Sequence, residues 1–270
     1  MSKIDLHIHT KYSDGEYDEY EIVRKIKEFG VEEFAICDHD TIDGVKRVIK
    51  VMENEPNLIF HTGVEFSAKS DNILGGINMH LLVRDFDIED EGMNHLIEKG
   101  AFLRKEKVQV MVDYIKEIYG VIISEEKIKE LESKTSSIGK PHMYRLLCEY
   151  GNYDREEYYK YMNKLNTEKY KIDAEEVLKY TTGKAYVTLA HPIEIMDEYN
   201  IGYDKIDEIV KYLVNLGLKG LETKHSKHTK EQYKEFSKIA KKYNLKETCG
   251  SDFHGPMNKP GVILGKCIKE

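Results

Sequence analysis

The stretch Ile4-Asp5-Leu6-His7-Ile8-His9 decides the fold, because apolar and polar residues alternate strictly along it. This alternation is typical of a β-strand with one buried face. Residues 18–29 follow with the apolar spacing of an amphipathic helix, and Gly30 stands where such a helix would end. The next apolar run, Glu33–Cys37, is typical of a strand buried on both faces of a parallel sheet. The chain therefore begins with a strand–helix–strand unit.

The alternation of strands and helices continues on both sides of a long helical stretch. Further strands are expected at 58–66, 77–83, 186–190, 220–223 and 247–250, and further helices at 43–53, 204–216 and 229–243. Residues 92–182 show helical periodicity alone. We therefore predict an α/β core formed by residues 1–84 and 185–270. A helical insertion at 85–184 is expected to cover the active site, and its part 99–184 has a slight excess of basic side chains, 17 against 15 acidic ones.

Composition limits the classes of function. The 270 residues carry 41 Lys and Arg against 49 Asp and Glu, a net charge of -8, which argues against a large nucleic-acid-binding surface. No apolar run approaches the roughly 18 residues of a membrane span. Residues Met1–Asp5 lead directly into the first strand, so we expect no secretory leader and predict a cytoplasmic protein. The oligomeric state stays open.

The four cysteines, Cys37, Cys148, Cys249 and Cys267, are far apart in the sequence and form no C-x-x-C pair. This pattern predicts neither a zinc site nor a disulfide framework. We expect free thiols, in keeping with a reducing compartment.

Histidines and acidic residues gather where the predicted strands end. The carboxyl ends of the strands of a β/α barrel meet on one face, which is where barrel active sites lie. Imidazole and carboxylate groups on one face are ligands for Mn, Fe or Zn. The residues at or after strand ends are His7, His9, His39, Glu65, His191, Asp252 and His254, while His80 lies within a strand.

Each of these motifs also has a simpler interpretation. Asp38-His39-Asp40 alone would suit a polar turn, Glu65 a solvated strand end, and Asp252-Phe253-His254 a helix cap with an exposed histidine. Because several independent strand ends carry such residues at once, the pattern as a whole favours a metal site.

Four motifs together resemble the PHP family of metal-dependent phosphoesterases, named for polymerase and histidinol phosphatase. They are Asp5-Leu6-His7-Ile8-His9-Thr10, Ser13-Asp14-Gly15, Asp38-His39-Asp40 and Gly250-Ser251-Asp252-Phe253-His254-Gly255. The resemblance covers about 1–83 and 186–270. It implies a distorted (β/α)7 barrel that holds three divalent metal ions. Mn2+ is the expected ion, with Zn2+ or Fe2+ as alternatives.

The resemblance also implies which residues hold the ions. It places His7, His9 and Asp252 on the first ion, His80 and His191 on the second, Glu65 between these two ions, and Asp14, His39 and His254 on the third. Carboxylates are needed in this set because they offset the repulsion between cations. We expect Asp5, Asp38 and Asp40 to orient the imidazole N–H groups of the ligands.

Two further segments, Ser136–His142 and Gly220–Thr229, resemble the subgroup that acts on nucleoside 3′,5′-bisphosphates. Members of this subgroup also trim short RNA from the 5′ end. The resemblance implies substrate contacts from Ser137, Lys140, His142, Arg145, His225 and His228. Lys140 stands where a relative often has arginine, so the phosphate is expected to be held less tightly than by a bidentate guanidinium.

The expected reaction is hydrolysis of a phosphate monoester by a hydroxide lodged between the first two ions. Glu65 and Asp252 are predicted to be catalytic through the metals, and His225 or His228 would protonate the leaving oxygen. The expected partner is a small phosphorylated substrate, a nucleotide or short oligonucleotide. Two alternatives of the same family stay open, a histidinol-phosphate phosphatase and a phosphodiesterase. A non-catalytic protein stabilised by metal is an alternative from a different class.

Overall fold

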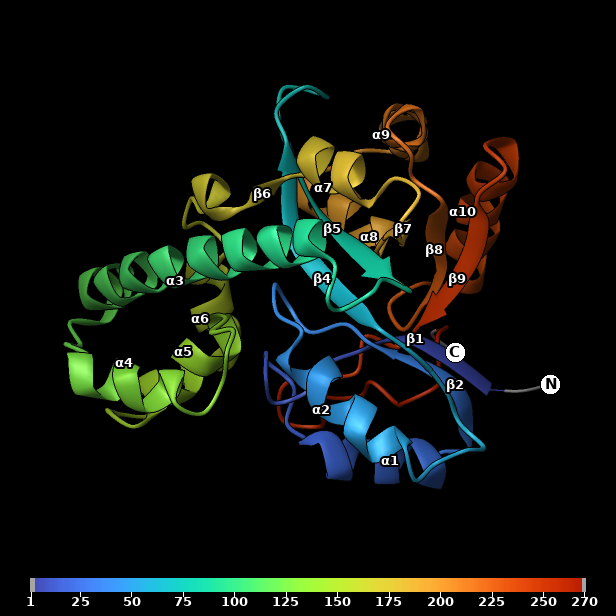
Figure 1. The fold of residues 1–270 in the computed structure, drawn as a ribbon. Helices are drawn as coiled ribbons and strands as arrows, with labels where there is room; N and C mark the ends of the chain where they lie inside the picture. The colour runs from blue at the N-terminus through green and yellow to red at the C-terminus, as the bar shows by residue number, and fades with distance from the viewer. Residues whose placement is uncertain (1–2, 269–270) are drawn as a thin grey trace.

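The computed structural model describes residues 3–268 and shows a strand core with a helical insertion beside it (Figure 1). The ends of the predicted barrel, residues 1–2 and 269–270, lie outside the described residues. The strands are β1 (Lys3–Ile8), β2 (Val31–Ile36), β3 (Ile59–His61), β4 (Gly63–Ser70), β5 (Ile77–Arg84), β6 (Ile172–Asp173), β7 (Tyr186–Leu189), β8 (Gly220–His225) and β9 (Lys246–Gly250).

The helices follow the predicted pattern with two additions. They are α1 (Glu19–Glu28), α2 (Asp43–Met52), α3 (Glu91–Tyr119), α4 (Glu125–Glu132), α5 (Lys140–Cys148), α6 (Arg155–Met162), the 3-10 helix η1 (Glu168–Tyr170), α7 (Ala174–Thr181), α8 (Pro192–Tyr199), α9 (Tyr203–Asn215) and α10 (Lys230–Lys242). The periodicity missed the short helix α8 and the two-residue strand β6. No helix within residues 3–268 is long and apolar enough to cross a membrane.

Seven strands surround the barrel interior. The hydrogen-bonded sheets run β1-β2-β3 and β6-β4-β5-β7-β8-β9. An isolated parallel bridge between His39 and Glu65 joins the end of β2 to β4, and a second one between Ile8 and Phe253 joins β1 to the segment after β9. The circuit β1-β2-β4-β5-β7-β8-β9 is therefore a distorted barrel, which confirms the predicted (β/α)7 fold.

The barrel departs from the predicted parallel pattern at two places. Strand β5 is antiparallel to both β4 and β7, and His80 lies opposite Ser67 in the middle of the β4–β5 ladder, within a strand as predicted. The strand predicted at 58–66 is split at Thr62, because β3 pairs with β2 while β4 pairs with β5. Hydrophobic periodicity carries no information about strand direction, which is why the antiparallel strand was not foreseen.

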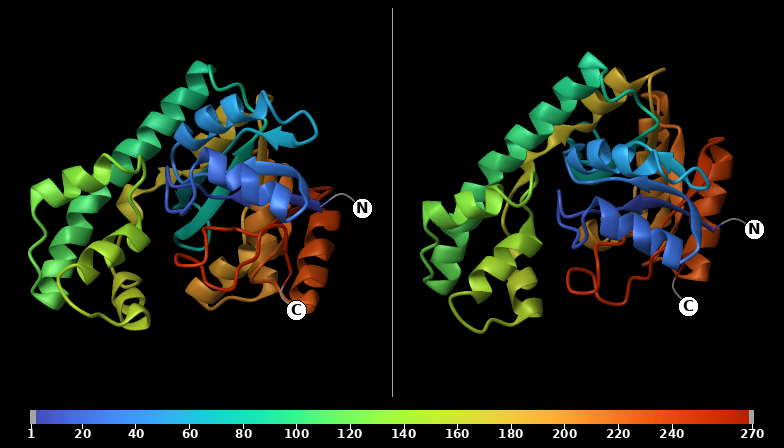
Figure 2. Two further views of the ribbon diagram at one scale, coloured as in Figure 1. Left: turned by 90° about the horizontal axis from the view of Figure 1, so that it is seen from below. Right: turned by 60° about the horizontal axis from the view of Figure 1, so that its bottom comes forward.

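The helical insertion has a hydrophobic core of its own. Met111 and Ile115 of α3 pack there with Leu147 of α5 and Tyr158 of α6. The first turns of α3 and the whole of α7 instead pack into the barrel core. In both views of Figure 2 the insertion lies to one side of the barrel, and α3 runs from the barrel into the insertion. The division at residues 85 and 184 stays a prediction.

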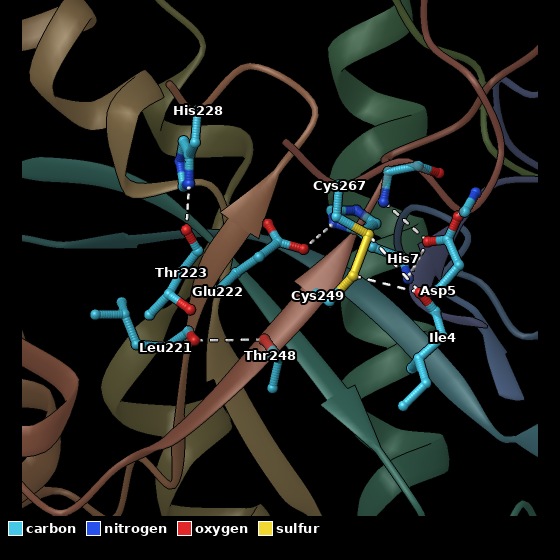
Figure 3. The surroundings of a disulfide bond; sticks show 12 residues. Ile4, Asp5, His7, Leu221, Glu222, Thr223, His228, Thr248, Cys249 and Cys267 are labelled. Atoms are coloured by element: carbon cyan, nitrogen blue, oxygen red, sulfur yellow. Dashed lines mark hydrogen bonds and ion pairs between the residues drawn. A yellow bond between two sulfur atoms is a disulfide. The ribbon is translucent and has the colours of Figure 1, made fainter. Parts of the chain in front are cut away.

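The expectation of four free thiols is wrong for one pair. Cys249 at the end of β9 forms a disulfide with Cys267, whose Cα lies 5.8 Å away (Figure 3). The pair forms because the C-terminal segment folds back along β1, where the Gly265 N–H donates to Asp5 Oδ2 over 2.7 Å. The sequence separation of 18 residues gave no sign of this return. Cys37 and Cys148 are free.

His61 on β3 links three parts of the barrel through its ring. Its Nδ1 lies 2.5 Å from Asp85 Oδ1, and its Nε2 lies 3.1 Å from Glu33 Oε1 on β2. The hydrogen bond to Asp85 raises the pKa of His61, and the same bond lowers the pKa of Asp85. A raised histidine pKa stabilises the fold below the unfolded value near 6.5, and this stabilisation is lost as pH rises through the folded pKa.

The substitution His61→Gln should therefore destabilise the protein in a pH-dependent way. We expect the free energy of unfolding to fall by about 1 kcal/mol near pH 5.5 and by much less near pH 9, measured by urea denaturation. His95→Gln, on the exposed surface of α3, is the control and should show no such difference. An equal loss at both pH values would contradict the charged pairing of His61.

Candidate active site

The first two predicted ligands lie side by side at the end of β1. Strand alternation turns His7 and His9 to the same face, and both side chains are fully buried. Their Nε2 atoms are 3.1 Å apart, and each lies 3.1 Å from Glu65 Oε2. Two imidazole nitrogens and a carboxylate oxygen that converge in this way can share one cation.

Glu65 of β4 is the centre of the cluster. Besides the two β1 histidines, its Oε2 lies 3.2 Å from His39 Nδ1. Its Oε1 lies 2.8 Å from His80 Nδ1 and 3.0 Å from His191 Nε2. One carboxylate thus touches imidazoles from four separate segments of the barrel, a position that suits a ligand shared between two ions.

The remaining predicted ligands continue the cluster on the other side of His9. Asp252 Oδ1 lies 3.4 Å from His9 Nε2 and 3.3 Å from His254 Nδ1. Asp14 Oδ1 lies 3.1 Å from His254 Nε2 and 3.9 Å from His39 Nε2. The structure thereby brings all nine predicted ligands together: His7, His9, Asp14, His39, Glu65, His80, His191, Asp252 and His254.

The donor atoms fit divalent cations. Within residues 3–268, mutually close sets include His9 with Asp14, His39 and His254, as well as His7 with Glu65 and His191. Asp14 Oδ1 and His39 Nδ1 are buried but make no hydrogen bond within the described residues. Buried polar atoms without such partners are expected where a cation supplies the missing interaction.

Burial and mutual charge set the protonation of the cluster. Burial disfavours a charge on His7, but Glu65 and Glu222 raise its pKa well above the usual value. Burial lowers the pKa of His39. Burial also opposes ionisation of Glu65, yet the nearby histidines hold its pKa well below the usual value. The central carboxylate therefore stays ionised, as a metal ligand must be.

Glu222 of β8 is a site residue that the sequence reasoning missed. Its Oε1 lies 3.1 Å from His7 Nδ1 (Figure 3). Its Oε2 accepts the His191 backbone N–H over 2.7 Å. When His7 Nδ1–H donates to Glu222, the Nε2 lone pair faces Glu65. Gly250 on β9 allows this approach, because a Cβ there would overlap both Glu222 and His7. Glu222 could have been found from the sequence as an acidic residue inside the strand predicted at 220–223.

The backbone is strained at three residues of the site. Asp40 (φ +51°), His191 (φ +22°) and Asp252 (φ +57°) occupy the left-handed region that disfavours side chains. Hydrogen bonds hold them there: the Asp40 N–H donates to Glu65 O over 3.0 Å, and the Asp252 N–H donates to His7 O over 2.9 Å. Strain of this kind is retained mainly where function requires the geometry.

Asp5 and Asp38 support the cluster in a different way than expected. Asp5 accepts the backbone N–H of Ser251 over 2.8 Å, so it fixes the loop that carries Asp252. Asp38 accepts the Ser13 hydroxyl over 2.6 Å, and that hydroxyl lies 3.4 Å from His9 Nδ1. In the described residues neither carboxylate hydrogen-bonds an imidazole directly. Burial raises the pKa of Asp5 to about 6.

Asp40 is likewise paired with groups other than imidazoles. It accepts Arg104 Nε over 2.8 Å and the Ser67 backbone N–H over 3.0 Å. A second missed residue, Lys259, forms an ion pair with Asp252 Oδ2. A third, Glu194, lies 3.3 Å from His191 Nδ1. Nothing in the sequence pattern marked Lys259 or Glu194 as partners, although each lies within seven residues of the ligand that it contacts.

The predicted substrate residues of the insertion lie beside the Asp14 loop. The Thr135 hydroxyl donates to Ser13 O over 2.8 Å and draws the segment 135–145 against that loop. Ser137 and His142 are buried, and burial lowers the pKa of His142 to about 4. Lys140 Nζ donates to Asn163 Oδ1 over 2.7 Å. Arg145 is exposed and contacts Asn258 Oδ1.

The two histidines after β8 have different surroundings. His225 Nε2 lies 3.2 Å from Asp252 Oδ2, and His225 Nδ1 accepts the Lys227 N–H, so its ring belongs to the cluster. His228 Nδ1 instead donates to Thr223 O over 2.8 Å (Figure 3). The His228 ring packs against Phe236. Burial lowers the pKa of His228 to about 4. The structure brings His225, but not His228, into contact with a predicted ligand.

A comparison with protein families agrees with the geometry, since the PHP domain matches residues 5–220. The chain belongs to the PHP family. Its structure resembles a Bifidobacterium adolescentis protein described as a metal-dependent phosphoesterase, with a TM-score of 0.80, 24% identity and coverage of 100% of this chain and 93% of that one. An amidohydrolase from Chromobacterium violaceum with bound sulfate has a TM-score of 0.81 at 20% identity, covering 98% and 90%. These two likenesses support the PHP-type fold.

Two curated relatives of this PHP-family chain match it over nearly their full length. A 5′-3′ exoribonuclease of Haemophilus influenzae is 26% identical over 98% of this chain and 93% of its own length. A phosphoribosyl 1,2-cyclic phosphate 1,2-diphosphodiesterase of Eggerthella lenta is 25% identical over 94% and 95%. Both names describe phosphoesterases, and the chain is a metal-dependent phosphoesterase of this family.

The substitution Glu222→Gln should weaken metal binding without unfolding the barrel. The amide keeps the size of the side chain but cannot hold both His7 Nδ1–H and the His191 N–H as a carboxylate does. We expect metal affinity to fall about 10- to 100-fold, measured by titration of the metal-free protein. Glu247→Gln on the neighbouring strand is the matched control, and an equal effect of both variants would contradict the role of Glu222.

Proposed function

We propose that this phosphoesterase removes the 3′-phosphate of nucleoside 3′,5′-bisphosphates and trims short RNA from the 5′ end. The observation that carries the proposal is the buried nine-donor cluster, with the insertion segment 135–145 held against one side of it. That segment supplies Lys140, a cation suited to a second phosphate, and Arg145, whose contact with Asn258 holds the segment against the loop after His254. The full-length relative named as a 5′-3′ exoribonuclease supports the same class of substrate.

The cluster would hold three divalent cations, with Mn2+ expected and Zn2+ or Fe2+ as alternatives. Such cations lower the pKa of a bound water and polarise a phosphoryl oxygen. The chain itself supplies the ligands, and Glu222 keeps the His7 lone pair directed toward Glu65. No serine or cysteine nucleophile is part of the proposal.

The proton for the leaving oxygen would come from His225. Its Nδ1 accepts the Lys227 N–H, so the ring proton resides on Nε2, beside Asp252 Oδ2. Donation to a departing alkoxide requires the imidazolium form of this ring, which returns to neutral imidazole when it gives up the Nε2 proton. His228 is the second candidate from the sequence, but its Nδ1–H already donates to Thr223 O inside the β8–α10 packing.

A phosphodiesterase activity is the second candidate function. It is favoured by the full-length likeness to the Eggerthella lenta cyclic phosphodiesterase. A histidinol-phosphate phosphatase remains the third candidate within the family. The non-catalytic alternative is set aside, because the chain is a PHP-family phosphoesterase.

A parallel assay of the Mn-loaded protein separates these candidates. We expect adenosine 3′,5′-bisphosphate to be hydrolysed with a higher kcat/KM than histidinol phosphate or a ribose 1,2-cyclic phosphate. The readouts are released inorganic phosphate for the two monoesters and ring opening, followed by chromatography, for the cyclic ester. Preference for either of the other two substrates would contradict the proposed specificity.

The substitution Glu65→Gln tests the central ligand. It keeps the size of the side chain but removes the charge between the imidazoles, so we expect kcat and bound metal both to fall at least about 100-fold. Metal content by elemental analysis and phosphate release are the two measurements. Wild-type turnover in this variant would contradict the assignment of Glu65.

A further inference from the structure

Three lysines of the insertion come together on the side that faces the barrel. Lys107 lies on α3, Lys140 opens α5, and Lys171 directly follows η1. We call these three residues the lysine cluster. Helix α3 packs against both α5 and η1, and all three side chains are half-buried.

The charge of the lysine cluster is poorly compensated. In residues 3–268, neither the Lys107 nor the Lys171 ammonium group makes an ion pair or a hydrogen bond, and the Lys140 ammonium group donates to the neutral Asn163 amide. Burial, followed by the neighbouring cations, lowers the pKa of Lys107 well below its usual value. Burial lowers the pKa of Lys171 to about 8. Grouped ammonium ions that lack carboxylate partners cost free energy, which a bound anion would offset.

The lysine cluster opens toward the metal ligands. Lys171 lines a pocket together with His80 and His191, two predicted ligands of the second ion. The nearby carboxylate Glu198 accepts Asn78 Nδ2 over 3.0 Å and is the main acidic group that faces Lys171. Glu168 also faces Lys171, whereas Asp40 near Lys107 is paired with Arg104, and Glu194 in the pocket is paired with Lys227. Two carboxylates do not balance three ammonium groups, so a net positive charge borders the site at this point.

The other cations of the insertion are already in use. Arg145 contacts Asn258 Oδ1, and Arg155 donates to the backbone carbonyls of Met257 and Asn258. These bonds hold the insertion against the loop that follows His254. Arg145 therefore serves the contact between insertion and barrel, and the uncommitted charge lies at the lysine cluster.

We propose that Lys107, Lys140 and Lys171 form a subsite for a second phosphate group of the substrate, one that is not hydrolysed. This inference rests on the proposed function. The group would be the terminal phosphate of a nucleoside bisphosphate or the next phosphodiester of a short RNA. Lysines bind phosphate as mobile point charges, which suits recognition that is independent of base sequence.

The kinetic test compares substrates with and without the second phosphate. We expect Lys107→Gln and Lys171→Gln to lower kcat/KM about 10-fold for adenosine 3′,5′-bisphosphate and to leave adenosine 3′-phosphate nearly unchanged. Lys105→Gln on α3 and Lys169→Gln on η1 are exposed matched controls. An equal loss with and without the second phosphate, an equal effect of the controls, or no loss on either the bisphosphate or a 5′-phosphorylated trinucleotide would overturn the subsite.

A second arm of this test identifies the source of the phosphate. A loss confined to the bisphosphate assigns the subsite to a terminal phosphate. A loss confined to a 5′-phosphorylated trinucleotide assigns it to a phosphodiester. Either result supports the subsite.

Chemical labelling tests the subsite without turnover. Lys107 and Lys171 should react faster with an amine reagent at pH 8 than Lys105 and Lys169, and adenosine 3′,5′-bisphosphate should protect them, as read by mass spectrometry. Protection without hydrolysis would keep the subsite and reject the proposed function. Hydrolysis with no protection, and no change in substrate preference, would reject the subsite alone.

Discussion

The structure depends on the burial of one carboxylate, Glu65, among imidazoles. An ionised carboxylate removed from water costs several kcal/mol unless its partners compensate. Here the partners come from β1, β5, the turn after β2 and the turn after β7, so each of these segments must reach the same point. Cations at that point would offset the remaining electrostatic cost, and for that reason metal binding and barrel geometry are coupled.

The two hydrogen-bonded sheets of the barrel meet at two junctions, which we call seams, and both seams lie at the ligand cluster. The β2–β4 seam is bridged at His39 and Glu65, and the β1–β9 seam is bridged at Ile8 and Phe253, beside His7 and Asp252. Regular ladders hold the rest of the circuit, whereas single backbone bridges hold these two places. Ions bound by residues from both sides of a seam would join the two sheets. The same ligand atoms would then contribute both to the stability of the barrel and to its activity.

The sequence predicted the parts of the fold that depend on local pattern. Alternation in β1 predicted the common face of His7 and His9, and the histidines and acidic residues at strand ends predicted the ligand cluster. Glu222 was missed because its partner His7 lies 215 residues away. The direction of β5 was missed because the alternation of apolar and polar residues is the same in parallel and antiparallel strands. The Cys249–Cys267 disulfide and the convergence of Lys107 with Lys171 depend on long-range folding in the same way.

The central claim is that Glu65 and the eight other ligand side chains of the cluster hold three divalent ions. The most direct measurement is a crystal structure of the Mn-loaded protein with anomalous difference maps recorded on both sides of the manganese absorption edge. The account predicts three peaks within the cluster, with Glu65 contacting two of them. A single ion, or ions bound away from Glu65, would contradict it.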